Sequence, residues 1–135
     1  MIEERHCSRE VSKLLCEKGF VQGTDLRMTR HLAFYDNEGL RYDIDRWYDS
    51  MVTENVPFVV APTHQMACDW LREVHHICIT IYPDKEKGFE VVLYDTESDV
   101  EITIQSFGVF GYHIFESSYG EAVEAAIKYS LENLV

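Results

Sequence analysis

Long apolar runs are absent from this sequence. Its 135 residues include no stretch close to the roughly 18 consecutive apolar residues that are needed to cross a bilayer. The chain begins with MIEERHCSREVSK, a charged segment that lacks the apolar core of a signal peptide. These two absences predict a cytoplasmic protein.

Basic side chains are scarce. The chain has 12 Lys+Arg against 24 Asp+Glu, which gives a formal net charge of −12. The imbalance is uneven, because residues 1–30 hold six basic and five acidic side chains (+1), whereas residues 89–135 hold nine acidic side chains and Lys128 (−8). An acidic surface repels phosphate backbones and anionic lipids, so we expect no direct binding of nucleic acid or of a membrane. Solubility is the simplest explanation of the charge.

The sequence also lacks the usual cysteine patterns and catalytic signatures. Cys7, Cys16, Cys68 and Cys78 show neither a disulfide framework nor a C-x-x-C pair, and reduced cysteines are expected. There is no Gly-rich phosphate loop, no G-x-S-x-G and no H-E-x-x-H. We therefore expect no cofactor and favour a protein that is not an enzyme.

What the sequence does contain is typical of a globular domain. Hydrophobic residues make up 46% of the chain and aromatic residues 13%, so a disordered chain is not expected. The length fits one domain, and a chain of this size can bury a core without disulfides. We expect a single α+β domain over residues 1–135.

Three helices are predicted from capping residues and apolar spacing. Ser8 caps a short N-terminal helix that ends before Gly19. Thr63 caps a second helix, and Ser118 with Glu121 fits a capping box for the last helix. The apolar stripes expected to be buried are Met66, Ala67, Trp70, Leu71 and Val74 in the second helix, and Tyr119, Ala122, Val123, Ala126, Ile127, Leu131 and Leu134 in the last.

The first strands are predicted from alternation and turn residues. His31–Tyr35 and Leu40–Ile44 flank a polar turn and should form a hairpin. Val56–Val60 is short and apolar, and its Pro57 makes it at best an edge strand.

A meander of three or four antiparallel strands should follow the second helix. Near His75–His76 the apolar spacing changes from helical to strand-like. Ile77, Ile79 and Ile81 should face one way, and Cys78, Thr80 and Tyr82 the other. The further strands expected are Phe89–Tyr94, Val100–Gln105 and Val109–Phe115. The predicted fold is therefore α+β, with an antiparallel sheet (a hairpin plus the meander) packed by two amphipathic helices, and a short N-terminal helix.

Two segments carry a resemblance to a known group of proteins. They read A-P-T-x-Q-x-A-x-x-W-L-R-E-V-H at residues 61–75 and Y-x-E-A-x-E-A-A-I-K-Y-x-L-E-N-L at residues 119–134. Both resemble an uncharacterised family of small proteins from gut anaerobic bacteria, often carried on prophages or other mobile elements. The resemblance implies a bacterial, cytoplasmic accessory protein related to phage or mobile-element biology. It assigns no catalytic or binding residue.

The densest group of potential metal ligands is His64, Cys68, His75, His76 and Cys78. His64 and Cys68 are four residues apart, so they share a helix face and are weak candidates for binding one metal ion. Since paired Cys/His spacing is missing, we favour no metal, and Cys68 as a small core residue. A small metal-dependent or thiol hydrolase that uses this cluster remains an alternative function.

The favoured function is a small, non-enzymatic interaction or accessory protein with a protein partner, as a monomer or a homodimer. Its possible interaction surface includes Trp47, Tyr48 and Phe58, in the least regular region, and Arg72 on the polar face of the second helix. The open face of the sheet is a further candidate surface. A second binding alternative is an acidic mimic of nucleic acid that inhibits a defence nuclease, motivated by the charge of residues 89–135.

Overall fold

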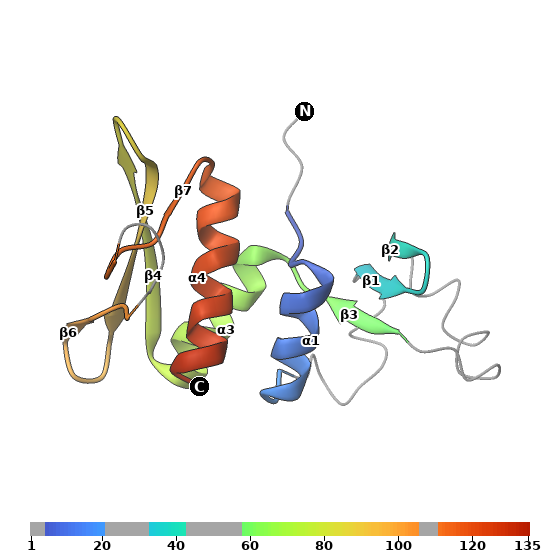
Figure 1. Cartoon of the computed structure of the whole chain (residues 1–135). Coiled ribbons are helices and arrows are strands. Elements are labelled where there is room, and N and C mark those ends of the chain that lie inside the picture. The colour runs from blue at the N-terminus through green and yellow to red at the C-terminus, as the bar shows by residue number, and fades with distance from the viewer. Residues whose placement is uncertain (1–4, 21–32, 43–57, 106–110) are drawn as a thin grey trace. The chain divides into compact units, whose positions relative to one another are not determined.

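The computed structural model describes residues 5–20, 33–42, 58–105 and 111–135 (Figure 1). It divides into two compact units, Met1–Thr63 and His64–Val135, which we describe separately. Across the described residues there are three helices and two antiparallel sheets, of three and four strands. The predicted α+β fold is confirmed, whereas a single domain over residues 1–135 stays a prediction.

The first unit contains the predicted N-terminal helix, α1 (Arg9–Glu17). The Ser8 hydroxyl accepts a hydrogen bond from the backbone N–H of Val11 at 3.2 Å, so the predicted N-cap is confirmed. The helix ends before Gly19, whose φ of 95° is the left-handed conformation that glycine tolerates best. The face formed by Val11 and Leu15 is buried, and the helix packs against β3 (Val59–Ala61).

The sheet of the first unit has the strand order β2-β1-β3. The predicted hairpin forms from β1 (Ala33–Asp36) and β2 (Gly39–Arg41), which are antiparallel. The strand β3 lies at the edge, as expected for Val56–Val60. Residues 31–32 and 43–44 of the predicted hairpin, and residues 56–57 of the predicted edge strand, lie outside the described residues.

The second unit begins with α3 (His64–His75), which leads directly into β4 (Ile77–Asp84). The single residue between them, His76, has a φ of 59° and reverses the chain. The predicted change from helix to strand at His75–His76 is therefore confirmed. The strand continues through Pro83 to Asp84, because β4 is an edge strand, where a missing N–H is tolerated.

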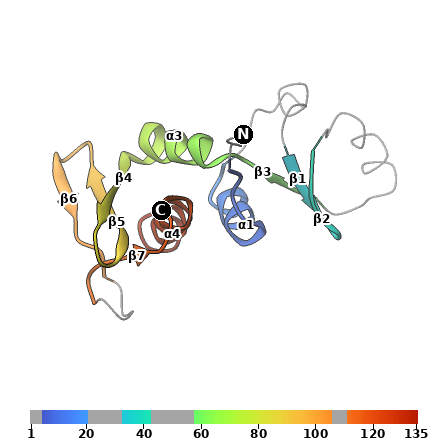
Figure 2. The same cartoon turned by 90° about the horizontal axis from the view of Figure 1, so that it is seen from above.

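The four-stranded sheet is centred on β5 (Gly88–Asp95). It pairs with β4 on one side, and with β6 (Val100–Ile102) and β7 (Phe115–Glu116) on the other. The last helix, α4 (Tyr119–Asn133), packs on β4 and β5, and α3 packs on β4. Both helices lie on the same face of this sheet (Figure 2).

Strand register determines which side chains face the helices. Ile77, Ile79 and Ile81 lie opposite Asp95, Leu93 and Val91, respectively. Since residues opposite each other in an antiparallel pair share a face, and Val91 and Leu93 are 2% and 0% exposed, the three isoleucines face the helices. The predicted alternation of β4 is confirmed.

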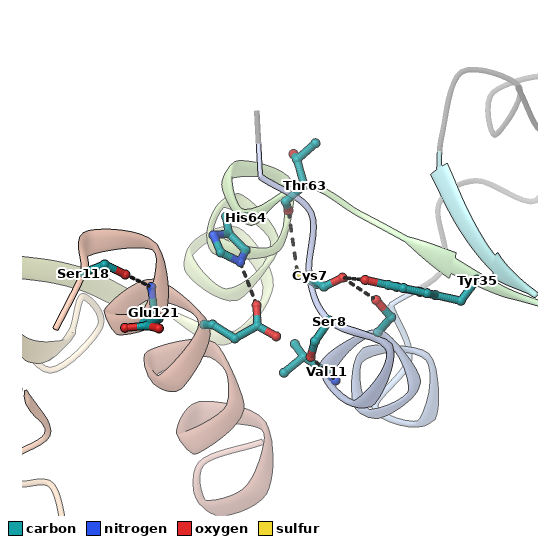
Figure 3. Close-up of polar contacts among 10 residues, drawn as sticks. Cys7, Ser8, Val11, Tyr35, Thr63, His64, Ser118 and Glu121 are labelled. Carbon is teal, nitrogen blue, oxygen red and sulfur yellow. Dashed lines mark hydrogen bonds and ion pairs between the residues drawn. The ribbon is translucent and has the colours of Figure 1, made fainter. Parts of the chain in front are cut away.

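The last helix begins as predicted, because the Ser118 hydroxyl accepts a hydrogen bond from the backbone N–H of Glu121 at 3.2 Å (Figure 3). Its buried face also includes Gly120 and Ser130, and the Ser130 hydroxyl donates to the carbonyl of Ala126.

Three residues of the predicted apolar stripes are exposed instead. Val74 is 54% exposed, Tyr119 is 59% exposed and Leu134 is 36% exposed. All three lie at helix ends: Val74 in the last turn of α3, Tyr119 at the start of α4, and Leu134 at its C-cap. Prediction of a continuous stripe was wrong at these ends, because a residue in the terminal turn of a helix has fewer neighbours to cover it than a residue in the middle.

Three chain reversals share one local structure. Each begins with an aspartate that is followed two residues later by a glutamate. The Oδ1 atom of the aspartate accepts hydrogen bonds from the backbone N–H groups of the second and third residues after it. The aspartates are Asp36, Asp84 and Asp95, and the donors are Glu38 and Gly39, Glu86 and Lys87, and Glu97 and Ser98. Because these bonds favour the charged carboxylate, they lower the pKa of each aspartate.

These aspartates should make the stability of the fold depend on pH. A carboxyl group whose pKa is lowered by folding stabilises the folded state above its unfolded pKa, and that stabilisation is lost as the pH falls through the folded pKa. We expect carboxyl NMR titrations to place Asp84 and Asp95 below the ordinary value of 3.8. The free energy of unfolding should fall less on acidification in Asp95→Asn than in the wild type. Glu101→Gln, at an exposed position on β6, should leave this pH dependence unchanged. Titration of Asp95 at or above the ordinary value would contradict this expectation.

Candidate functional site

His64, the first residue of α3, contacts the last helix rather than the other predicted ligands. Its Nε2 lies 2.7 Å from Oε2 of Glu124 in α4 (Figure 3). The two side chains are 13% and 25% exposed, so this is a partly buried contact between helices. It gives His64 a structural role that joins α3 to α4.

The two cysteines of the predicted cluster lie on different elements, Cys68 on α3 and Cys78 on β4. Burial, reinforced by the negative charge of Asp69, raises the pKa of the Cys68 thiol to about 11. A thiol with such a pKa is almost entirely protonated at neutral pH, and the thiolate is the form that attacks a substrate. The surroundings of Cys68 therefore oppose the role of a nucleophile.

Thiol reactivity provides a direct measurement of this environment. At pH 7.5 we expect Cys16, which is exposed on α1, to react quickly with a chromogenic disulfide reagent. Cys68 should react at least about tenfold more slowly, because little of it is thiolate. Peptide mapping after a timed exposure distinguishes the two positions, and Cys16→Ser provides the control. Faster labelling of Cys68 than of Cys16 would contradict its high pKa.

His75 and His76 differ sharply in their surroundings. The His75 ring packs edge-on against Trp70, with the ring centroids 4.6 Å apart, and its Nε2 is buried without a hydrogen-bond partner among the described residues. The His76 side chain is 49% exposed, with its Nε2 4.0 Å from Glu97. In the described part of the second unit, no three histidine, cysteine or acidic side chains bring ligand atoms within 4.8 Å of one another.

The residues predicted to form an interaction surface are divided among the first unit, the second unit and a segment outside the described residues. Arg72 lies on α3, where it pairs with Asp69 at 2.7 Å and with Glu73 at 3.5 Å. Phe58 is half-buried in the first unit, where its ring packs against the buried ring of Phe34. Trp47 and Tyr48 lie outside the described residues.

The open face of the sheet, which the sequence suggested as a further surface, is well described. We call the side of the four-stranded sheet away from α3 and α4 the outer face. By register, β4, β5, β6 and β7 contribute to it Cys78, Thr80, Tyr82, Glu90, Val92, Tyr94, Glu101 and Phe115. Tyr82 is 54% exposed, and Val92, Tyr94 and Phe115 are half-buried. Antiparallel sheets usually place polar residues on their solvated side, and this face departs from that pattern.

Polar contacts organise the two ends of the outer face. At one end, His113 Nδ1 lies 2.9 Å from Glu90 Oε1, and the Lys87 ammonium lies 4.8 Å from the centroid of the Phe115 ring. At the other end, the Tyr94 hydroxyl donates to Asp99, and this hydrogen bond raises the pKa of Tyr94. Glu90, Phe115 and Tyr94 of this face are therefore each contacted by a side chain from a segment next to the strands.

The acidic residues of the second unit are distributed over several elements. Asp95 accepts backbone hydrogen bonds in the turn after β5, and Glu124 contacts His64. Others lie on β5, on β7 and along α4, at Glu90, Glu116, Glu121 and Glu132. Several of these carboxylates thus take part in folding contacts.

The described residues contain no helix that is both long and apolar enough to cross a membrane. Comparison with protein-family models, with curated proteins and with solved structures finds no match for this chain.

Proposed function

We propose that this protein is a non-enzymatic interaction protein and that the outer face of its four-stranded sheet binds a protein partner. The observation that carries the proposal is the set of apolar and aromatic side chains on that face, Tyr82, Val92, Tyr94 and Phe115, opposite the helix-covered face. Protein interfaces are enriched in aromatic side chains, and contiguous apolar surface on a solvated face marks interaction sites.

The geometry of the outer face suits a rigid docking surface. Its side chains project from hydrogen-bonded strands, and three of them come from consecutive alternate positions of the central strand β5: Glu90, Val92 and Tyr94. Binding to such a surface loses little conformational freedom, because the backbone is already ordered. A sheet face matches a folded partner or an extended segment better than it matches a small molecule, which usually requires a concave pocket.

We place this activity in the bacterial cytoplasm, as an accessory function of phage or mobile-element biology. The resemblance of residues 61–75 and 119–134 to small proteins of prophages and other mobile elements supports this setting.

The proposal is tested by capture of partners from a lysate of the native host. Full-length wild-type protein is compared with a double variant of the outer face, Tyr82→Thr with Val92→Thr. The matched control is Tyr42→Thr with Val100→Thr, because Tyr42 and Val100 are 59% and 58% exposed and lie off the outer face. Threonine preserves strand propensity, so circular dichroism should be unchanged in both variants.

We expect at least one protein to be captured by the wild type and the control, and to be lost with the outer-face variant. Quantitative mass spectrometry should show a decrease of about tenfold or more, as expected when one anchoring aromatic ring is removed and a polar hydroxyl replaces a methyl group beside it. Capture of the same proteins by all three, or of none by the wild type, would contradict the proposal.

A further inference from the structure

We propose that three side chains on the outer face, Tyr82, Glu90 and Phe115, bind a cationic arginine or lysine side chain of the protein partner. These three residues, hereafter the aromatic row, lie side by side on β4, β5 and β7. The inference rests on the proposed function, because it names the chemistry of the partner at the same face.

Register places a carboxylate between two aromatic rings. Glu90 lies opposite Tyr82 on one side and opposite Phe115 on the other, so the three side chains project from the same face on adjacent strands. Aromatic rings attract cations through their faces, and a carboxylate accepts charge-assisted hydrogen bonds from ammonium and guanidinium groups. An aromatic–carboxylate–aromatic row thus offers both interactions to one cation.

Basic groups of the chain itself contact two members of the aromatic row. The Lys87 ammonium, from the turn between β4 and β5, lies 4.8 Å from the centroid of the Phe115 ring. The imidazole of His113, a group that can also carry positive charge, lies 2.9 Å from the Glu90 carboxylate. Two basic side chains of this chain therefore already lie against members of the aromatic row.

The accessible surface and the charge of the chain support an external cation. Tyr82 is 54% exposed, and the Glu90 side chain is 29% exposed, so neither is closed to a ligand. The net charge of −12 attracts a basic partner and repels an acidic one. Charge complementarity thus favours a basic protein segment over a nucleic acid.

The first test uses full-length protein and two synthetic probes, hexa-arginine amide and hexa-citrulline amide. Citrulline has nearly the shape of arginine without its charge. We expect hexa-arginine to shift the NMR signals of the aromatic row and hexa-citrulline to leave them unchanged. Glu90→Gln should weaken binding of hexa-arginine about tenfold, and Glu132→Gln, the same change in charge on α4, less than about twofold.

The second test removes the resident ammonium. Lys87→Met removes the ammonium group that lies over the Phe115 ring, whereas Lys85→Met makes the same change in charge at an exposed neighbouring position. Because Lys87 competes with the probe, the affinity for hexa-arginine should be about threefold higher for Lys87→Met than for Lys85→Met. If Glu90→Gln and Glu132→Gln change the affinity for hexa-arginine equally, net charge alone attracts the probe and the inference is overturned. The same conclusion holds if Lys87→Met and Lys85→Met change it equally.

Failure of this inference is distinguishable from failure of the proposed function. If native partners are captured equally well by the wild type and by Glu90→Gln, but are lost with the double variant of the outer face, the outer face binds protein without the cationic contact. If no partner is captured at the outer face, the proposed function itself fails.

Discussion

Replacement of Gly88 by alanine is expected to destabilise the second unit by about 3 kcal/mol or more. Gly88 opens β5 with a φ of 94°, a conformation that costs a residue with a side chain about 1–2 kcal/mol. A Cβ atom at this position would also lie 2.3 Å from the backbone carbonyl oxygen of Glu116 and 3.2 Å from the Cα of Ser117. Backbone atoms cannot rotate away as a flexible side chain can, so β7 would have to move off β5.

The matched control is Gly19→Ala. Gly19 has nearly the same φ, 95°, but a Cβ there would meet no atom within 4 Å. The control should therefore show the conformational cost alone, about 1 kcal/mol. Urea unfolding followed by circular dichroism gives both values, and hydrogen exchange of the β5 amides locates the damage. Equal destabilisation by the two variants would mean that contact between Gly88 and β7 is unimportant.

Truncation of Leu93 to alanine is expected to destabilise the protein about as much as Gly88→Ala does. Leu93 is 0% exposed on the central strand of the four-stranded sheet, opposite Ile79 and Ile102. Removal of a buried leucine side chain loses its burial and leaves a cavity, at a typical cost of about 2–5 kcal/mol. We expect the free energy of unfolding to fall by about 3 kcal/mol, measured by urea denaturation.

Leu134→Ala makes the same chemical change where the side chain is 36% exposed, at the C-cap of α4. It should cost less than about 1 kcal/mol. Similar losses at both positions would show that the helix-facing side of the sheet is not the core that register and burial indicate.

Local signals in the sequence were sufficient to predict most of the elements. Ser8 and Ser118 each start a helix by accepting a hydrogen bond from the backbone N–H three residues later, so a short window of sequence contains the information needed. The alternation of β4 likewise depends on neighbouring residues, and it predicted correctly which side chains share a face.

Contacts between distant residues could not be predicted in this way. The pairing of β7 with β5 and the contact between His64 and Glu124, which are 60 residues apart, depend on how the chain returns on itself. The aromatic row joins residues from three strands, and alternation alone does not specify which strands are neighbours. The sequence therefore predicted an open sheet face and the share of it that β4 contributes, but not the residues that β5, β6 and β7 place beside them.

The three aspartate turns described above have a practical consequence for redesign of this acidic chain. The carboxylates of Asp36, Asp84 and Asp95 accept hydrogen bonds from backbone N–H groups of the turns. Neutralising these aspartates would weaken the hydrogen bonds and destabilise the turns. Glu86 and Glu97, in the same turns, contribute backbone N–H groups to these hydrogen bonds, and any residue except proline can supply those. Glutamine at both positions would change the net charge from −12 to −10 and leave the turn bonds in place. Net charge and turn formation are thus separable properties of this chain.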